Sequence, residues 1–324
     1  MNIAKQIESA WFKRFSLISV LLLPLTLLFW LLSSVNRMLF KVGLKRAYKS
    51  PVPVIVVGNI SVGGNGKTPM VIYLANLLKE QGKHVGIISR GYGARPASTP
   101  FAVKADTSTH EGGDEPVLLA KRTGCPVYIG GDRKASIEKM MSEHSIDVII
   151  SDDGLQHYAL ARDIELCIVD AKRQYGNRLL MPSGPLREGT WRLQSVDLVV
   201  FNGLTNGQAS YVLEATGLHG VADEQPINPP FPSGCALSAI GNPKRFYDSL
   251  SAYGVNLDDE RHFRDHHHFE PQDIPSGVTY MTEKDAVKCR SFAHEQCYYL
   301  RVDAIPNALL KQQLNTILKD KGVL

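Results

Sequence analysis

The residues with the clearest chemical meaning form a glycine-rich stretch between positions 58 and 69, which contains Gly66-Lys67-Thr68. A run of β-branched residues at 53–57 precedes this stretch, and a segment with helical periodicity at 70–78 follows it. A buried strand, a glycine loop and a helix in this order are typical of a phosphate-binding P-loop. The strict P-loop pattern has a glycine where this chain has Ser61.

The residue types in this loop suit the phosphates of a nucleotide. Glycines allow backbone N–H groups to face an anion at a helix N-terminus, because no Cβ stands in the way. Lys67 is placed to reach the β- and γ-phosphates, and the Thr68 hydroxyl can bind Mg²⁺. The residues expected to contact the nucleotide are Ser61, Val62, Gly63, Gly64, Asn65, Gly66, Lys67 and Thr68.

A second candidate element is an apolar strand at 147–151 that runs into Asp152 and Asp153. In P-loop enzymes a carboxylate at such a strand end holds Mg²⁺ or its water. Adjacent side chains on a strand point to opposite faces, so one of the two carboxylates is expected to aim at the metal. A solvated Asp-Asp-Gly turn is the alternative. Gln156 follows near the same strand edge, where the ligands of open α/β sheets collect.

Three further polar clusters lie where a predicted strand ends or a predicted helix begins. They contain Arg90 with Tyr92, then Asp114, and then Arg133. Each cluster alone is better explained as a turn or a cap than as a site, and for Asp114 the alternative is a helix N-cap. Their shared placement predicts that they lie on one rim, at the carboxyl ends of the strands.

Two regions of the second half also carry candidate residues. The Gly- and Pro-rich loop at 173–188 ends in Arg187 and Glu188, and long loops in compact domains tend to be functional. Residues 264–269 include three consecutive histidines, which cannot easily share one metal, so a zinc site is not expected there. A single histidine working with a carboxylate and an exposed polar turn both remain open.

The N-terminus is strongly apolar and positively flanked. Fourteen of the eighteen residues at 15–32 are strongly apolar and none is charged. A helix of this length spans roughly 27 Å, close to the ~30 Å hydrocarbon core of a bilayer. Residues 1–50 carry eight Lys or Arg and one Glu (+7), whereas the rest of the chain carries 28 basic and 31 acidic residues (−3). We predict a membrane-associating helix that spans the bilayer or lies in one leaflet, with a signal peptide or a buried core helix as alternatives.

The overall composition narrows the class of protein. With 44% hydrophobic and 21% charged residues, the chain is neither disordered nor collagen-like. The net charge of +4 is too small to argue for nucleic-acid binding, and no obligate protein partner is evident. Five scattered cysteines without a C-x-x-C pair argue against a disulfide framework or a structural zinc site.

The order of elements predicts an α/β fold with a P-loop NTPase-like, mostly parallel sheet flanked by helices. A second, smaller α/β domain and the N-terminal apolar helix are expected to complete it. We expect the membrane-associating helix at 1–36, the P-loop nucleotide-binding domain at 37–163 and the second domain at 164–324. The last segment of the chain could return to the P-loop domain.

One motif keeps a different function open. Thr282-Glu283-Lys284-Asp285 follows a predicted strand at 278–281 and superficially resembles the N/T-K-x-D motif that recognises guanine. Glu283, the second residue of this stretch, does not fit the guanine motif. The alternative function is a membrane-associated P-loop GTPase that acts as a switch or a metallochaperone.

Taken together, these motifs resemble those of the tetraacyldisaccharide 4'-kinases, the lipid A 4'-kinases of Gram-negative bacteria. The resemblance covers nearly the whole chain, from the apolar helix through a glycine loop that also lacks glycine at Ser61. The remaining motifs follow in the same order: Ser89-Arg90-Gly91-Tyr92-Gly93, Gly113-Asp114-Glu115-Pro116, Gly131-Asp132-Arg133, Asp152-Asp153-Gly154-x-Gln156-His157, Pro185-Leu186-Arg187-Glu188, Asp265-His266 and Thr282-Glu283-Lys284-Asp285.

The resemblance implies a reaction and a location. The γ-phosphate of ATP passes to the 4'-hydroxyl of a tetraacylated glucosamine disaccharide 1-phosphate and gives lipid IVA, with Mg²⁺ as the metal. The resemblance also implies a two-domain P-loop fold at the cytoplasmic face of the inner membrane. A substrate with four acyl chains leaves the bilayer only at a cost of about 0.8 kcal/mol per CH₂, so the enzyme has to come to the membrane.

The resemblance further implies roles for single residues. Asp114 corresponds to the catalytic base, paired with a histidine that maps to His266 or, one position later, to His267. Asp152 and Asp153 correspond to carboxylates associated with Mg²⁺. The positions associated with the substrate are Arg90, Tyr92, Arg133, Gln156, Arg187 and Glu188.

Overall fold

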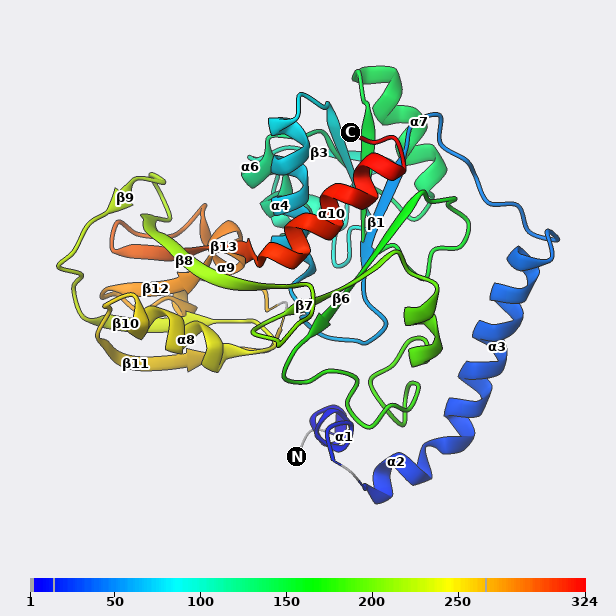
Figure 1. Cartoon of the computed structure of the whole chain (residues 1–324). Helices are drawn as coiled ribbons and strands as arrows, with labels where there is room; N and C mark the ends of the chain where they lie inside the picture. The colour runs from blue at the N-terminus through cyan, green and yellow to red at the C-terminus, as the bar shows by residue number, and fades with distance from the viewer. Residues whose placement is uncertain (1–2, 14, 266) are drawn as a thin grey trace. The chain divides into compact units, whose positions relative to one another are not determined.

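The computed structural model describes residues 3–13, 15–265 and 267–324. The chain forms two compact units, each assembled from separated segments (Figure 1). Unit 1 contains residues 1–67, 146–212 and 306–324, and unit 2 contains residues 68–145 and 213–305. The domain boundaries after residues 36 and 163 stay a prediction.

Strands and helices alternate along most of the chain, as the sequence predicts for an α/β fold. The helices are α1 (Ile3–Ala10), α2 (Leu17–Leu21), α3 (Leu23–Lys41), α4 (Lys67–Glu80), α5 (Thr109–Gly112), α6 (Asp114–Thr123), α7 (Arg133–Glu143), α8 (Pro243–Ala252), α9 (Glu283–Cys289) and α10 (Ala308–Asp320). The strands are β1 (Val54–Gly58), β2 (Val85–Ser89), β3 (Phe101–Val103), β4 (Val127–Ile129), β5 (Val148–Asp152), β6 (Ile164–Asp170), β7 (Leu198–Asn202), β8 (Ser210–Gly220), β9 (Pro226–Ile227), β10 (Gly234–Ser238), β11 (Leu257–His262), β12 (Thr279–Thr282) and β13 (Cys297–Pro306).

Unit 1 is built on four parallel strands in the order β7-β6-β1-β5. Every residue of β1, β5 and β6 is buried, which explains why these segments read as continuous apolar runs rather than alternating ones. Because the strands are parallel, their carboxyl ends share one edge. The residues that reach this edge are Gly58, Asp152, Asp170 and Asn202.

Unit 2 contains a parallel set in which β10 lies between β11 and β12, and β13 follows β12. Neighbouring residues on these strands enter different buried clusters, since side chains alternate between the faces of a sheet. Ala236 and Tyr280 belong to one cluster, whereas Leu237 and Met281 belong to the other. Unit 2 also contains β2 and β4, which pair in parallel, and β3, which is antiparallel to β4.

The polar, proline-rich segment 204–232 contains the long strand β8 (Ser210–Gly220). In unit 2 this strand pairs with β9 in antiparallel register, with Leu218 opposite Ile227. The two strands form a hairpin, but β8 also lies beside β13 in the strand order and is therefore not an edge strand.

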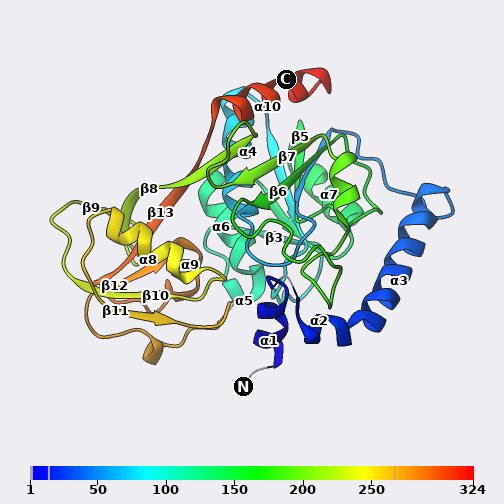
Figure 2. The same ribbon diagram turned by 60° about the horizontal axis from the view of Figure 1, so that its bottom comes forward.

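The N-terminal apolar segment forms two helices rather than one. The helical conformation is interrupted at Leu22, between α2 and α3. Pro24 lies in the first turn of α3, where proline is tolerated. In Figures 1 and 2, α3 (blue) runs along the outside of unit 1, away from the sheet. Within the described part of the chain, α3 is the one helix that is long and apolar enough to cross a membrane, and 6% of its most apolar window is buried. It is therefore not the buried core helix that the sequence also allowed.

Polar contacts tie α1 and α3 to the 173–188 loop. The Trp11 indole donates to the Pro182 carbonyl at 2.9 Å, and the Thr26 hydroxyl donates to Ser183 Oγ at 2.7 Å. The Asn177 N–H donates to the Trp11 carbonyl at 2.7 Å. These contacts fix how the apolar helices leave the body of unit 1.

The C-terminal helix α10 is fixed to unit 1 by Asn307, and this contact gives a stability prediction. Asn307 Oδ1 accepts the Leu310 and Ser210 N–H groups at 2.8 and 3.3 Å, and Nδ2 donates to the Gln208 carbonyl at 2.8 Å. We expect Asn307→Ala to lower the free energy of unfolding by about 1–2 kcal/mol, because a helix cap and a loop contact are lost together. Urea unfolding followed by circular dichroism measures this. Asn206→Ala in an exposed turn is the control, and equal stability of the two variants would contradict the assignment.

Candidate functional site

The predicted phosphate loop connects β1 to α4, and its conformation depends on two glycines. Gly63 and Gly66 adopt φ values of +99° and +89°, in the region that residues with a Cβ rarely enter. A Cβ on Gly66 would also collide with the side chains of Asn202 and Tyr211. The loop thus needs glycine at position 66 for both conformation and space.

Side chains from other strands and loops hold the loop's carbonyl groups. Arg173 Nη2 donates to the Gly64 carbonyl at 2.5 Å, Asn202 Nδ2 to the Asn65 carbonyl at 3.1 Å, and the Tyr211 hydroxyl to the Gly66 carbonyl at 2.6 Å. With the carbonyls bonded in this way, the opposite face of the peptide groups can offer N–H donors to an anion.

The sequence motifs do not assign a function to Arg173, Asn202 or Tyr211. Asn202 ends strand β7, so the rule that ligands gather at the carboxyl ends of parallel strands could have pointed to it. Arg173 is the first residue of the 173–188 loop, which is predicted to be functional because of its length. No local pattern marks Tyr211, which lies just inside β8.

Lys67 and an arginine from the 173–188 loop both contact Asp153, the residue that follows β5. The Lys67 ammonium is 3.6 Å from Asp153 Oδ1, and Arg187 Nη1 donates to both Asp153 oxygens at 3.0 Å. Burial raises the pKa of Asp153, but Lys67 and Arg187 outweigh this effect and hold the pKa below its usual value. Asp153 is therefore ionised at neutral pH and pairs with both cations.

Asp152 and Asp153 occupy different environments although they are adjacent. Asp152 is 1% exposed at the end of β5, whereas Asp153 follows the strand with φ +50° and has a side chain that is 32% exposed. Within the described residues, no three His, Cys, Asp or Glu side chains gather into a metal site. Mg²⁺ on a nucleotide needs one or two carboxylates besides phosphate and water oxygens, so this donor set fits Mg²⁺ held together with phosphates.

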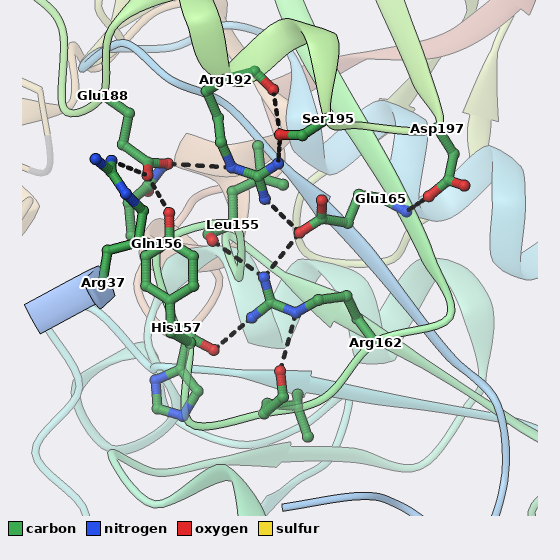
Figure 3. A network of polar contacts seen from close by, with 12 residues as sticks. Arg37, Leu155, Gln156, His157, Arg162, Glu165, Glu188, Arg192, Ser195 and Asp197 are labelled. Carbon is green, nitrogen blue, oxygen red and sulfur yellow. Dashed lines mark hydrogen bonds and ion pairs between the residues drawn. The ribbon is translucent and has the colours of Figure 1, made fainter. Parts of the chain in front are cut away.

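A polar network extends from Asp153 to the N-terminal helix α3, and Figure 3 shows the part that contains Gln156, Glu188 and Arg37. Gln156 accepts from Arg187 at 3.4 Å and donates to Glu188 Oε2 at 2.9 Å. Arg37 of α3 stacks over the Trp191 ring at 4.0 Å, with Nη1 3.9 Å from Glu188 Oε1. Three of the predicted substrate residues, Gln156, Arg187 and Glu188, are thus brought together in unit 1.

Glu188 is 5% exposed and is surrounded by donors. The Tyr158 hydroxyl donates to Glu188, and burial together with that carboxylate raises the pKa of Tyr158 to about 12. Arg192 lies 3.7 Å from Glu188 and donates to Glu165 at 2.5 Å. Figure 3 shows these arginines and glutamates alternating, which neutralises carboxylates that would be costly to bury alone.

In unit 2, Asp114 is the first residue of α6 rather than its N-cap. The N-cap residue is Gly113, with φ +79°, so the capping alternative for Asp114 is wrong. The Asp114 side chain is 12% exposed and lies 3.8 Å from Lys288 Nζ. The next residue, Glu115, accepts from Lys284 at 3.1 Å.

The other predicted residues of unit 2 differ in exposure. Tyr92 is 73% exposed and Arg90 is also exposed, whereas Arg133 is 3% exposed and donates to the Gly130 carbonyl at 3.0 Å. Thr68, the predicted metal ligand after Lys67, follows in α4.

His266 lies outside the described residues, so its role stays a prediction. The alternative, His267, contacts Asp273 at 3.0 Å and stacks on Phe263 at a centroid distance of 4.5 Å. Burial raises the pKa of Asp273, but the Glu270 N–H and the His267 ring outweigh this and hold it below its usual value. These contacts give His267 a packing function within unit 2.

The Thr282–Asp285 motif does not present a guanine site. Asp285 is fully buried, accepts the Ala239 N–H at 3.0 Å and the Thr282 hydroxyl at 2.7 Å, and pairs with Lys288 at 2.7 Å. Guanine recognition by such a motif requires a carboxylate free to meet the base. Here the carboxylate is used inside the unit.

The chain is similar to known proteins over most of its length. The profile of the LpxK family, tetraacyldisaccharide-1-P 4'-kinase, matches residues 18–319. A tetraacyldisaccharide 4'-kinase of Pseudoalteromonas translucida (strain TAC 125) is 50% identical over 322 residues, 98% of this chain and 98% of that protein. A tetraacyldisaccharide 4'-kinase of Haemophilus influenzae (strain 86-028NP) is 46% identical over 301 residues, 91% of this chain and 90% of that protein.

A solved structure agrees with these sequence matches. The crystal structure of the "apo" form of LpxK from Aquifex aeolicus in complex with ATP has a TM-score of 0.78 and 29% identity, and the match covers 93% of this chain and 99% of that chain. The predicted α/β P-loop fold is confirmed, and the GTPase alternative is not favoured. A profile match over nearly the whole chain and close relatives of the same length show that the chain belongs to the tetraacyldisaccharide-1-P 4'-kinase family.

Proposed function

We propose that the chain carries out its family's phosphoryl transfer with the glycine loop holding ATP and Asp114 acting as general base. As a member of this family, the chain is a lipid kinase of lipid A biosynthesis: it phosphorylates the 4'-hydroxyl of a tetraacyldisaccharide 1-phosphate and forms lipid IVA. The observation that carries the proposal is the group of charges in unit 1, where Lys67 at the end of the loop and Arg187 both pair with Asp153.

ATP is the phosphoryl donor in this proposal. The loop amides and the N-terminus of α4 would bind the phosphates, and Lys67 would exchange part of its contact with Asp153 for the β- and γ-phosphates. The relative from Aquifex aeolicus that shares this fold was crystallised with ATP. Phosphoryl transfer passes through a loose transition state, so positioning and neutralisation of charge matter more than covalent chemistry.

Mg²⁺ fits the residues at the end of β5. Thr68, Asp152 and Asp153 are the oxygen ligands that would hold it, directly or through water. When bound, Mg²⁺ would neutralise charge on the phosphates. Arg187 is paired with Asp153 at 3.0 Å and would orient that carboxylate.

Asp114 is the proposed acceptor of the proton from the 4'-hydroxyl. As the O–H bond breaks, the oxygen forms a bond to the γ-phosphorus and the bond between this phosphorus and the bridging oxygen of ADP breaks. A carboxylate in this role contributes about 10²–10⁴-fold in rate. We propose His266 as its partner.

The substrate's sugar and phosphate groups would contact Arg90, Tyr92, Arg133, Gln156, Arg187 and Glu188. Three cations in this set suit a phosphorylated sugar. The hydrogen bonds between Gln156, Glu188 and Arg187 support a shared role for these three residues.

Membrane association follows from the character of the N-terminal helices. Exposed apolar side chains on α3 include Leu27, Leu28 and Leu31, at 64%, 53% and 51% exposure. The basic residues around this segment would attract anionic lipid. We propose that the enzyme works at the cytoplasmic face of the inner membrane, where its acylated substrate is held.

Lys67→Met is expected to lower kcat by at least about 10²-fold, because phosphate charge loses its lysine partner in the transition state. Transfer of radiolabelled phosphate from ATP to the disaccharide lipid, separated by thin-layer chromatography, measures this. Lys104→Met, at an exposed lysine of unit 2, is the matched control. Transfer by Lys67→Met at the control rate would remove Lys67 from the mechanism.

Asp114→Asn keeps the shape of the side chain and removes its basicity, so kcat should fall by about 10²–10⁴-fold while the KM for ATP changes little. Asp106→Asn, at an exposed aspartate before α5, serves as the control in the same assay. Turnover of Asp114→Asn near the wild-type rate would assign the base elsewhere.

The triple variant Leu27→Gln/Leu28→Gln/Leu31→Gln is expected to weaken binding to anionic phospholipid vesicles by at least about 10²-fold, since each leucine loses roughly 1.5–3 kcal/mol of burial in the bilayer. Vesicle sedimentation measures the bound fraction. Leu204→Gln, at an 88% exposed leucine outside the helices, should bind like the wild type. Unchanged sedimentation of the triple variant would refute membrane contact through α3.

A further inference from the structure

Helices α6 and α9 of unit 2 are joined by ion pairs along their length. Near the start of α6, Lys284 donates to Glu115 at 3.1 Å; near its end, Arg122 pairs with Glu283 at 2.5 Å. The residues of the Thr282–Asp285 motif thus face the helix that begins with the proposed base. The phosphoryl-transfer mechanism described above leaves this motif unused.

Lys288, in the last turn of α9, is the most deeply placed cation of this helix pair. Its side chain is 4% exposed, and its ammonium lies 2.7 Å from Asp285 Oδ1 and 3.8 Å from Asp114 Oδ2. The same ammonium donates to the His267 carbonyl at 3.3 Å and lies 5.0 Å from the centre of the Phe269 ring. One buried cation therefore joins three segments: α9, the start of α6 and the chain after β11.

Asp285 is one of several oxygen partners of Lys288. Its Oδ2 accepts the N–H of Ala239, which follows β10, and the Thr282 hydroxyl of β12, while its Oδ1 lies 2.7 Å from the ammonium. Burying an ammonium is costly unless several groups of opposite polarity surround it. Besides Asp285, the Asp114 carboxylate and the His267 carbonyl are the oxygen groups close to the Lys288 ammonium.

We infer that Lys288 is a positioning residue for the phosphoryl transfer: it fixes the Asp114 carboxylate relative to the backbone at His267. This inference rests on the proposed function, in which Asp114 is the base. A cation at this distance favours the ionised carboxylate, which is the form that accepts a proton. Removing it would leave both the orientation and the charge state of Asp114 less well defined.

The other charged groups described around this cluster are Lys284 on α9, Glu115 on α6 and Asp265 in the loop after β11. Burial lowers the pKa of Lys284, but the carboxylates of Glu115, Asp265 and Asp114 outweigh it and hold the pKa above its usual value. Lys284 thus stays charged at neutral pH. It pairs with Glu115 at 3.1 Å and lies 3.8 Å from Asp265, whereas the Lys288 ammonium lies 3.8 Å from Asp114 Oδ2.

The test is Lys288→Met, measured by the thin-layer assay at saturating substrates and expressed per folded enzyme. We expect kcat to fall by about 10²-fold, within the range a positioned base contributes, while the KM for ATP changes less than about threefold. The acid limb of the kcat–pH profile should move up by about one pH unit, because the carboxylate loses a neighbouring positive charge. Wild-type kcat and an unmoved acid limb would overturn the inference.

A matched control and a double variant separate positioning from packing. Lys244→Met breaks an exposed lysine–aspartate pair of α8 in the same unit and should leave kcat unchanged. Asp285→Asn/Lys288→Met removes both members of the buried pair, so thermal stability should recover relative to Lys288→Met while kcat and the acid limb stay altered. Recovery of kcat in the double variant would show a purely structural lysine and would overturn the inference.

A comparison with Asp114→Asn distinguishes this inference from the proposed function. If Lys288 acts through Asp114, Lys288→Met should slow Asp114→Asn much less than it slows the wild type, since coupled residues are not additive. A fully active Asp114→Asn would overturn the base assignment and the inference together. An inactive Asp114→Asn beside a Lys288→Met variant with normal kcat would overturn the inference alone.

Discussion

The ion pair between Lys67 and Asp153 is the interaction on which the arrangement of unit 1 depends. Lys67, which we propose contacts the triphosphate, lies at the end of a glycine loop, and its side chain is 12% exposed. Such a cation needs a partner before the nucleotide arrives, because an unpaired charge at this depth is costly. Asp153, at the end of the neighbouring parallel strand, supplies that charge, and Arg187 holds the carboxylate in place.

The charges around this pair explain much of the rest of unit 1. Arg187 donates to Gln156, which donates to Glu188. Glu188 in turn contacts Tyr158, Arg192 and Arg37, and Arg37 belongs to the N-terminal helix α3. Each buried carboxylate in this path has a cation or a hydroxyl beside it, as the cost of burying charge requires. The path therefore joins the phosphate loop to α3, the helix that we propose contacts the membrane, through direct polar contacts.

In unit 2, buried charges are also paired with groups of opposite charge. Its helices α6 and α9 are held together by Arg122, Lys284 and Lys288, each opposite a carboxylate of the partner helix. The proposed base, Asp114, lies at one end of this helix pair. A group that must take up and release a proton is more effective in one fixed position, which a pair of packed helices provides better than a loop.

The sequence alone determined the strand, loop and helix at 53–78, the carboxylates at the end of β5, the apolar N-terminus and the family. These features could be predicted because backbone conformation and burial produce short-range patterns of glycine, charge and hydropathy. Only the tertiary structure decided where the apolar segment breaks, that Gly113 rather than Asp114 caps α6, and which distant side chains serve the loop. Tyr211 and Lys288 carry no local signature. Arg173 in the long loop and Asn202 at a strand end have one, but it does not show what they contact, since these contacts depend on which strands and helices become neighbours. Packing and the cost of burying charge determine which groups far apart in the chain pair with each other. Neither effect can be predicted from the residues adjacent to these groups in the sequence.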